Sequence, residues 1–401
     1  MSLVSGECAV EFEDLRRRFE ANLSDGEDCG ASVAVFVDGE PVVDLWGGFV
    51  DEARTTPWSR DTIINVFSCT KTVTALCALT LADDGELDLD APVNRYWPEF
   101  AAAGKGGVLV RHLLGHTSGL SGWAEPTTLA DLLDWELCTG RLAAQEPWWT
   151  PGSASGYHAF THGFLVGEVV RRVTGTGFGD FFRARIAAPL GADFTIGLPE
   201  GQEYRTANVL QCDPPVFDGL DDPSSLPYRT FANPEPSTAF SASTGWRRAE
   251  IPAVNGHGNA RSLALIHAAL ASGGEANTGR LMSPAGCRRV LDEQSDGRDL
   301  ALRYPIRFGL GYALSPRGPR MPVSGEACFW GGWGGSLTVA DLGSGMSFAF
   351  VMNRMGQGTM GDKRGIGLLR AARDGVDEWR RSAGRPAHGA GRRSTGEREK
   401  P

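Results

Sequence analysis

Hydrophobic and polar positions in the first part of the chain alternate between the periods of helices and strands. Apolar residues at helical spacing predict a helix over residues 11–24. Two β-rich runs follow at 31–37 and 42–50, and the Asp38-Gly39 pair between them is typical of a tight hairpin turn. The period then returns to that of a helix over 68–82. The chain is therefore predicted to begin as helix, hairpin and helix.

The middle of the chain has mostly helical patterns, and strand patterns return only near its end. The helical period predicts helices at 127–138, 159–173, 177–187 and 261–272. Proline, glycine, aspartate and serine are frequent over 189–252, which predicts long loops. Three β-like runs come at 307–313, at 327–340 with glycine interruptions, and at 347–352, before a last helix over 362–380.

Strands at both ends with helices between them indicate an α/β fold in which one sheet is assembled from both termini. We expect residues 1–67 and 300–382 to form a discontinuous α/β sheet domain flanked by helices. Residues 68–299 would form a large inserted domain, mostly helical and with long loops. The tail 383–401 is polar and rich in arginine and glycine, which predicts disorder.

Composition and charge narrow the class of protein and of partner. Hydrophobic residues are 41% of the chain and charged residues 22%, values near globular averages that exclude disordered and fibrous classes. The 39 basic and 49 acidic residues give a net charge of −10, which argues against nucleic acid or a membrane as partner. Residues 1–20 lack a secretory signal, and no run approaches the roughly 20 apolar residues of a membrane span. We therefore expect a cytoplasmic protein whose partners are small molecules or other proteins.

The first chemical motif opens the best-defined predicted helix. Ser68 and Lys71 stand three residues apart, a spacing that puts both side chains on one helical face. A buried lysine loses its proton easily because desolvation disfavours the ammonium, and the free amine can then deprotonate a serine. Taken alone, the motif is better explained by a serine that caps a helix with a lysine in its first turn.

Two further motifs contain residues suited to the same reaction. Tyr157 ends a Gly- and Ser-rich segment just before a predicted helix, where a phenol can transfer a proton between a nucleophile and a leaving group. Four glycines lie within the strand pattern 330–336, and such glycines mark the close approach of a ligand or another backbone. Backbone N–H groups on that edge could stabilise an oxyanion. Alone, the two motifs are explained as well by a loop-anchoring tyrosine and by a glycine-rich bend with two core tryptophans.

Together and in this order, the three motifs resemble those of the serine β-lactamase and penicillin-binding-protein superfamily. Residues 111–120 and 189–191 are similar to that superfamily as well. Within it the chain looks most like the class C-related esterases called family VIII carboxylesterases. The reason is that Tyr157-His158 replaces Tyr-x-Asn, and 330–332 reads Trp-Gly-Gly in place of Lys-Thr-Gly.

The resemblance covers residues 12–380 and implies the β-lactamase/DD-peptidase-like fold, in which the sheet is antiparallel. It also implies that Ser68 is the acylated nucleophile, that Lys71 is its base and that Tyr157 completes the proton relay. The backbone N–H groups of Ser68 and Trp333 would form the oxyanion hole. The residues that we expect to contact substrate are Trp330, Gly331, Gly332, Trp333 and His158.

Two departures from the superfamily's pattern bear on the substrate. Ala159 and Trp330 stand where β-lactam-processing relatives carry residues that hold a substrate amide and a carboxylate. An antibiotic-hydrolysing role is therefore not expected. Of the tryptophans near the motifs or in the long loops, we expect only Trp330 and Trp333 to wall an apolar substrate cleft.

The leading hypothesis is a serine hydrolase that acts on small esters through an acyl-enzyme and needs no cofactor. An acyltransferase is the nearest alternative, because an amine or alcohol can intercept the same acyl-enzyme in the biosynthesis of small molecules such as secondary metabolites. A non-catalytic binding protein on the same fold is an alternative of another class. His158 and His162 stand four residues apart, but no third ligand is suggested, so we expect no metal. No feature of the sequence indicates an oligomeric state.

Overall fold

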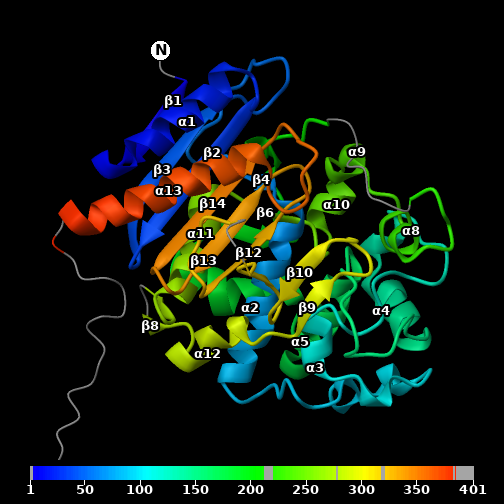
Figure 1. Cartoon of the computed structure of the whole chain (residues 1–401). Helices are drawn as coiled ribbons and strands as arrows, with labels where there is room; N and C mark the ends of the chain where they lie inside the picture. The colour runs from blue at the N-terminus through cyan, green and yellow to red at the C-terminus, as the bar shows by residue number, and fades with distance from the viewer. Residues whose placement is uncertain (1–2, 212–219, 277–278, 318–320, 383, 385–401) are drawn as a thin grey trace, which may run out of the picture.

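A nine-stranded antiparallel sheet joins the two ends of the chain (Figure 1). The structure, a computed structural model, describes residues 3–211, 220–276, 279–317, 321–382 and 384. The strand order is β1-β3-β2-β14-β13-β12-β11-β10-β9. The strands are β1 (Val4–Cys8), β2 (Gly30–Val37), β3 (Glu40–Gly48), β9 (Ser295–Arg298), β10 (Pro305–Phe308), β11 (Ala313–Leu314), β12 (Ala327–Gly331), β13 (Leu337–Asp341) and β14 (Met346–Met352). The predicted antiparallel sheet built from both termini is confirmed.

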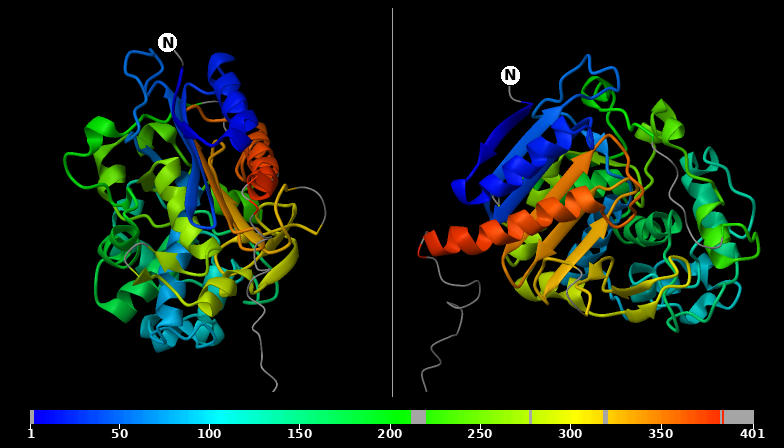
Figure 2. Two further views of the ribbon diagram at one scale, coloured as in Figure 1. Left: turned by 90° about the vertical axis from the view of Figure 1, so that its left-hand side faces the viewer. Right: turned by 45° about the horizontal axis from the view of Figure 1, so that its top comes forward.

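The two ends of the chain meet where β14 pairs with β2, in register from Ala31 to Val37. Both strands are buried at every position, the pattern of strands that are covered on both faces. Helices α1 (Glu13–Ser24) and α13 (Lys363–Ser382) cover one face, whereas α11 (Ala260–Ala271) and the remaining helices lie on the other (Figure 2). The sheet is thus the middle layer of the fold.

The helices on the second face include those that surround the candidate site. They are α2 (Thr70–Asp83), α3 (Val110–Leu114), α4 (Trp135–Ala144), α5 (Thr161–Thr174), α6 (Phe178–Phe182), α7 (Ala188–Leu190), α8 (Leu226–Phe231), α9 (Thr238–Ser241), α10 (Thr244–Arg248) and α12 (Pro284–Arg288). A small sheet in the order β4-β6-β5 and a hairpin complete the described strands: β4 (Ile64–Asn65), β5 (Phe194–Ile196), β6 (Gly256–Gly258), β7 (Glu275–Ala276) and β8 (Gly279–Arg280). In the part of the chain that the structure describes, no helix combines the length and apolar character needed to cross a bilayer.

Two predicted elements have different bounds in the structure. The helix expected at 127–138 begins only at Trp135, because the Asp134 side chain accepts the Leu137 N–H at 3.0 Å and caps the helix there. The strand expected at 307–313 is instead two strands, β10 and β11, that turn back on each other. Gly311 lies in this turn with a φ of +83°, a conformation that other residues rarely adopt.

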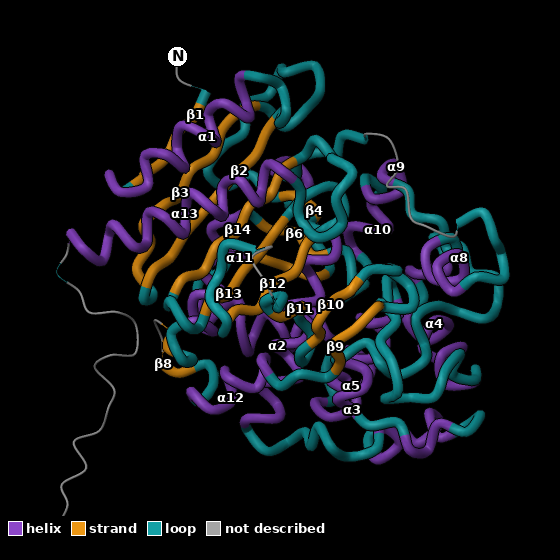
Figure 3. The backbone as a smooth tube through the Cα atoms, viewed as in Figure 1, coloured by secondary structure: helices purple, strands orange, loops and turns teal. Residues whose placement is uncertain are grey.

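The predicted loop region 189–252 is mainly loop, with β5 and the short helices α8, α9 and α10 inside it (Figure 3). The predicted helical region 68–299 also contains two elements that belong with the sheet. Helix α11 packs on β2, β13 and β14, and strand β9 begins at Ser295. The division into two domains therefore stays a prediction, and α11 and β9 do not follow the predicted boundary at residue 299. Apart from residue 384, the tail 383–401 lies outside the described residues.

Candidate active site

The short turn that carries Ser68 lies between the small sheet and helix α2. Residues Phe67–Cys69 form a single 3₁₀ turn that leads directly into the helix. The Thr70 hydroxyl donates to the Phe67 carbonyl at 2.5 Å and accepts the Gly256 N–H at 2.8 Å. Phe67 itself has a φ of +45°, which is rare for a residue with a side chain. The small sheet thus fixes the turn in the conformation that presents Ser68.

Lys71 lies one helical turn after Ser68 and is completely buried. Its Nζ is 3.1 Å from Ser68 Oγ, 2.7 Å from the Ala159 carbonyl oxygen and 3.0 Å from the Ala253 carbonyl oxygen. Burial lowers the pKa of this amine well below its usual value. No carboxylate among the described residues forms an ion pair with it. As a free amine, Lys71 can donate both N–H groups to the two carbonyls and direct its lone pair at Ser68.

Tyr157 reaches Ser68 from the other side. Its hydroxyl is 2.7 Å from Ser68 Oγ, and Lys71 Nζ lies 4.8 Å above the centre of its ring. Burial raises the pKa of Tyr157, so the side chain is a neutral phenol that donates to Ser68. The loop that carries Tyr157 is held in place by Asp299, whose Oδ1 accepts the Tyr157 N–H at 3.1 Å. The structure therefore brings Ser68, Lys71 and Tyr157 together, as the motifs predict.

The glycines of the third motif allow two backbones to come close together. A Cβ on Gly332 would lie 2.3 Å from the Val66 carbonyl oxygen, and one on Gly331 would lie 2.4 Å from Met360 Cα. Glycines in a strand indicate the close approach of either a ligand or another backbone segment. Here, backbone of this chain approaches Gly331 and Gly332. This contact places the end of β12 against the segment that leads into Ser68.

Trp333 follows these glycines and packs against the residue before the nucleophile. The Phe67 and Trp333 rings meet edge to face with their centres 5.3 Å apart. Among the described residues, neither the Ser68 N–H nor the Trp333 N–H has a hydrogen-bond partner. Both groups are thus available to a ligand, and their role as an oxyanion hole stays a prediction.

Trp330 and His158 do not lie where a substrate would touch them. The Trp330 indole is 1% exposed and packs behind Tyr157, with the ring centres 5.2 Å apart. His158 is fully buried and its Nε2 lies 2.7 Å from Ser118 Oγ. Of Trp330 and Trp333, only Trp333 lines the pocket, because the Trp330 side chain is buried in the core.

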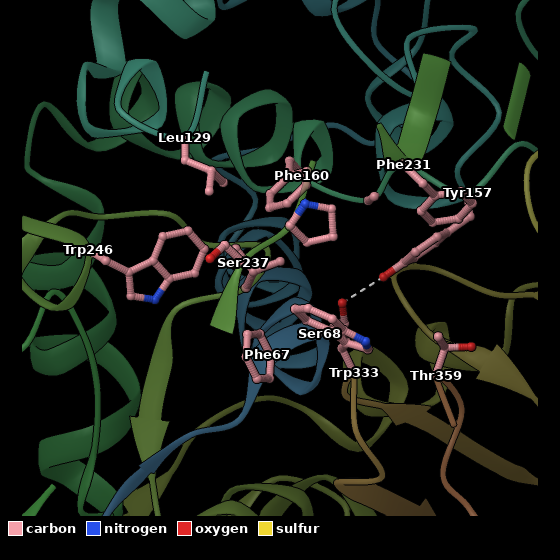
Figure 4. Close-up of a pocket in the computed structure, with 13 residues that line it drawn as sticks. Phe67, Ser68, Leu129, Tyr157, Phe160, Phe231, Ser237, Trp246, Trp333 and Thr359 are labelled. Carbon is pink, nitrogen blue, oxygen red and sulfur yellow. Dashed lines mark hydrogen bonds between the residues drawn. The ribbon is translucent and has the colours of Figure 1, made fainter. Parts of the chain in front are cut away.

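Ser68 lines a pocket with a volume of about 650 Å³, which includes the open mouth of the pocket (Figure 4). The pocket is lined by Phe67, Ser68, Leu129, Tyr157, Ala159, Phe160, Phe231, Pro236, Ser237, Trp246, Val254, Trp333 and Thr359. Not one of these side chains is charged. Trp246, which was not expected to wall the cleft, is part of the lining. The pocket therefore suits an uncharged, largely apolar ligand.

The family follows from the whole chain together with this site. A model of the Beta-lactamase family matches residues 15–372. The chain belongs to the Beta-lactamase family. It is 36% identical to Esterase/beta-lactamase LipL of Mycobacterium tuberculosis, over 88% of this chain and 83% of LipL. The sequence resemblance and the predicted fold are thereby confirmed.

Two solved structures of this family are equally similar to the chain. One is a family VIII carboxylesterase, with a TM-score of 0.86 and 40% identity over 92% of this chain and 98% of the other. The second is a penicillin-binding protein homologue from Caulobacter crescentus, also with a TM-score of 0.86 and 40% identity, over 93% and 99%. Because these two proteins are named for different activities, the substrate has to be argued from the site.

A buried arginine far from the nucleophile holds the loop that carries Trp333. The Arg364 guanidinium, 4% exposed, donates to the Gly334 carbonyl oxygen at 2.8 Å. It is itself held by Asp28 at 2.6 Å and by Asp362 at 2.6 Å. We call Arg364, Asp28 and Asp362 the arginine clamp. No local sequence pattern marks the clamp, because Asp28 and Arg364 are 336 residues apart.

Replacing Lys71 by arginine tests the base. Arginine keeps its proton, so Lys71→Arg preserves a cation but cannot accept the Ser68 proton. We expect kcat on an activated ester to fall at least roughly 100-fold, the lower end for loss of a general base. Steady-state kinetics measure this loss, and circular dichroism checks that the variant is folded. A folded variant within a few-fold of wild type would show that Lys71 acts only through its charge.

Replacing Tyr157 by phenylalanine tests the proton relay without changing the shape of the ring. The hydroxyl that donates to Ser68 is lost, and so is the route to the leaving group. We expect kcat/KM, which reports acylation and not the later hydrolysis of the acyl-enzyme, to fall about 100-fold or more for esters of poorly acidic alcohols. The loss of kcat/KM should be smaller for nitrophenyl esters, whose leaving group needs little protonation. Equal losses of kcat/KM for both ester classes would remove Tyr157 from protonation of the leaving alcohol.

Replacing Arg364 by lysine tests whether the arginine clamp positions the Trp333 N–H. Lysine keeps the charge but cannot hold Gly334, Asp28 and Asp362 at once. We expect kcat to fall about 10- to 100-fold with KM within a few-fold, because a misplaced oxyanion donor weakens only the transition state. Binding of a phosphonate transition-state analogue should weaken in parallel with kcat.

The matched control for the clamp is Arg380→Lys. Arg380 is on the same helix and pairs with Asp38 at 3.1 Å, but has no contact with the 332–335 loop among the described residues. The control should lower the melting temperature without changing kcat. A folded Arg364→Lys variant with lowered melting temperature and wild-type kcat would show that the arginine clamp only stabilises the fold.

Proposed function

We propose that this protein is a serine hydrolase that cleaves small, neutral esters through an acyl-enzyme. The observation that carries the proposal is the convergence of Lys71 Nζ at 3.1 Å and Tyr157 OH at 2.7 Å on Ser68 Oγ. A nucleophile within hydrogen-bond reach of a base, itself oriented by further groups, is the signature of covalent catalysis. The names of LipL and of the family VIII carboxylesterase support the ester class.

The proposed reaction has two half-reactions that use the same groups. Ser68 Oγ attacks the ester carbonyl carbon while the hydroxyl proton of Ser68 passes to the Lys71 amine. The oxyanion that forms accepts hydrogen bonds from the backbone N–H groups of Ser68 and Trp333. The carbon–oxygen bond to the alcohol then breaks, and the proton held by Lys71 reaches the leaving oxygen by way of the Tyr157 hydroxyl. Water takes the place of the alcohol and reverses these steps, which releases the acid and restores the Ser68 hydroxyl.

The uncharged pocket favours neutral substrates. A penicillin brings a carboxylate, which would be desolvated here without a cationic partner, and burying an unpaired charge is costly. Lys71, which contacts Ser68, is already engaged with two carbonyls, and burial lowers the pKa of its amine well below the usual value. We therefore propose esters with apolar acyl groups as substrates and expect penicillins to be cleaved poorly. The absence of a cofactor and the cytoplasmic location stay predictions.

The test is a panel of neutral esters with Ser68→Ala as control. Wild type should hydrolyse the esters and show the mass of one acyl group on the intact protein, whereas Ser68→Ala should do neither and stay folded. Labelling by a fluorophosphonate should likewise depend on Ser68. Full activity of Ser68→Ala would overturn the proposal, and a wild type that neither turns over nor labels would favour a binding protein.

The acyltransferase is distinguished in the same panel by adding amines or alcohols. We expect free acid as the main product. Coupled product that dominates at low acceptor concentration would replace the esterase by the acyltransferase. Rapid hydrolysis of a penicillin would contradict the argument from the uncharged lining.

A further inference from the structure

The pocket has two differently built sides, one on each side of Ser68. Tyr157 and Thr359 lie on one side of the nucleophile, whereas Phe67 and Trp246 lie on the other (Figure 4). The second side is formed by buried aromatic and aliphatic residues. Phe67, Phe160 and Trp246 lie there in Figure 4, and Val254 joins them because its carbonyl oxygen accepts the Asn65 amide, whose oxygen accepts from Trp246. These four residues are between 3% and 7% exposed, and we call them the acyl chamber. On the first side Tyr157 and Phe231 are also buried, whereas Thr359 is half-buried.

The position of Tyr157 decides which part of an ester lies on which side. The leaving oxygen has to come within hydrogen-bond reach of the Tyr157 hydroxyl to be protonated. The acyl substituent is bonded to the same carbon as that oxygen and therefore points away from it. The direction away from Tyr157 is the direction of the acyl chamber. The alcohol part accordingly lies towards Thr359.

Trp246 is the largest residue of the acyl chamber and is rigidly held. Its Nε1–H donates to Asn65 Oδ1 at 2.8 Å, and the Asn65 amide donates to the Val254 carbonyl oxygen at 2.7 Å. Asn65 is itself 4% exposed, in the strand that leads to Ser68. The distance between the nucleophile and the indole is thus set by buried hydrogen bonds, so the chamber cannot lengthen simply by turning a side chain.

We propose that the acyl chamber holds the acyl group and that Trp246 sets the longest acyl chain that the enzyme accepts. The inference rests on the proposed function and makes it more specific. The substrates are esters whose acyl group is short and apolar, and the alcohol part is much less restricted in length. The leaving alcohol departs on the Tyr157 side, and water or another acceptor arrives there while the acyl group stays in the chamber.

The experiment measures kcat/KM in two ester series. The first joins one alcohol, p-nitrophenol, to linear acyl chains of increasing length, and the second joins one acyl group, acetyl, to linear alcohols of increasing length. For wild type, kcat/KM should drop sharply beyond a certain acyl length and show no such drop in the alcohol series. In Trp246→Ala the drop should occur at an acyl chain longer by about two or more carbons. On the shortest acyl ester that wild type cleaves poorly, this variant should raise kcat/KM at least about tenfold.

Two further variants keep the outcome interpretable. Trp246→Phe shortens the side chain with less disturbance, and should move the fall in the same direction by a smaller step. Phe240→Leu is the matched control, because Phe240 packs edge to face on Trp246 with the ring centres 6.0 Å apart but does not line the pocket. It should leave both profiles unchanged. If Phe240→Leu shifts the acyl-length profile of kcat/KM as much as Trp246→Phe does, then loosened packing around the acyl chamber controls the profile, and the length of the residue 246 side chain does not.

The result separates this inference from the proposed function. A wild type that cleaves esters, with folded Trp246 variants that leave the acyl profile unmoved, overturns the inference alone. A shift in the alcohol series instead of the acyl series reverses the two sides and also overturns it. A wild type that cleaves no ester of either series overturns the proposed function, and the inference with it.

Discussion

The burial of the Lys71 amine is the constraint on which the rest of the site depends. An ammonium at this place would have no carboxylate partner among the described residues, and desolvation therefore favours the neutral amine. A neutral amine has two N–H donors and one lone pair. The carbonyls of Ala159 and Ala253 take the donors, so the lone pair is left for Ser68. Burial thus lowers the pKa of the Lys71 amine, and the two carbonyls orient it towards Ser68.

Those two carbonyls come from distant parts of the chain, and their convergence explains several features of the fold. Ala159 is two residues after Tyr157, so one loop supplies both a carbonyl for Lys71 and the phenol for Ser68. Ala253 comes just after the long loop region 189–252 and lies so close to α5 that a Cβ on Gly163 would be 2.3 Å from its nitrogen. Gly163 is therefore needed for the approach, although nothing in its local sequence indicates it.

The placements that the sequence predicted and that the structure has are those whose evidence is local. The spacing of Ser68 and Lys71 follows from one helical turn, and the hairpin at Asp38 follows from its turn residues. The arginine clamp could not be predicted in this way, because its members meet only after the sheet has joined both termini. Trp330 shows a related limit. The expected strand 327–340 is interrupted, because β12 ends at Gly331 and Trp333 lies in the turn that follows, where the alternation of a strand no longer tells which side a residue faces.

The small number of groups that can transfer a proton at Ser68 also bears on the choice between hydrolysis and acyl transfer. Lys71 and Tyr157 are the groups in contact with Ser68 Oγ among the described residues, so one amine and one phenol have to serve both half-reactions. A nucleophile that attacks the acyl-enzyme must then deliver its proton along the path by which the first alcohol received one. Water and alcohols meet identical catalytic groups on this path. The partition between them is therefore decided by which molecule occupies the Tyr157 side of the pocket when the acyl-enzyme is attacked.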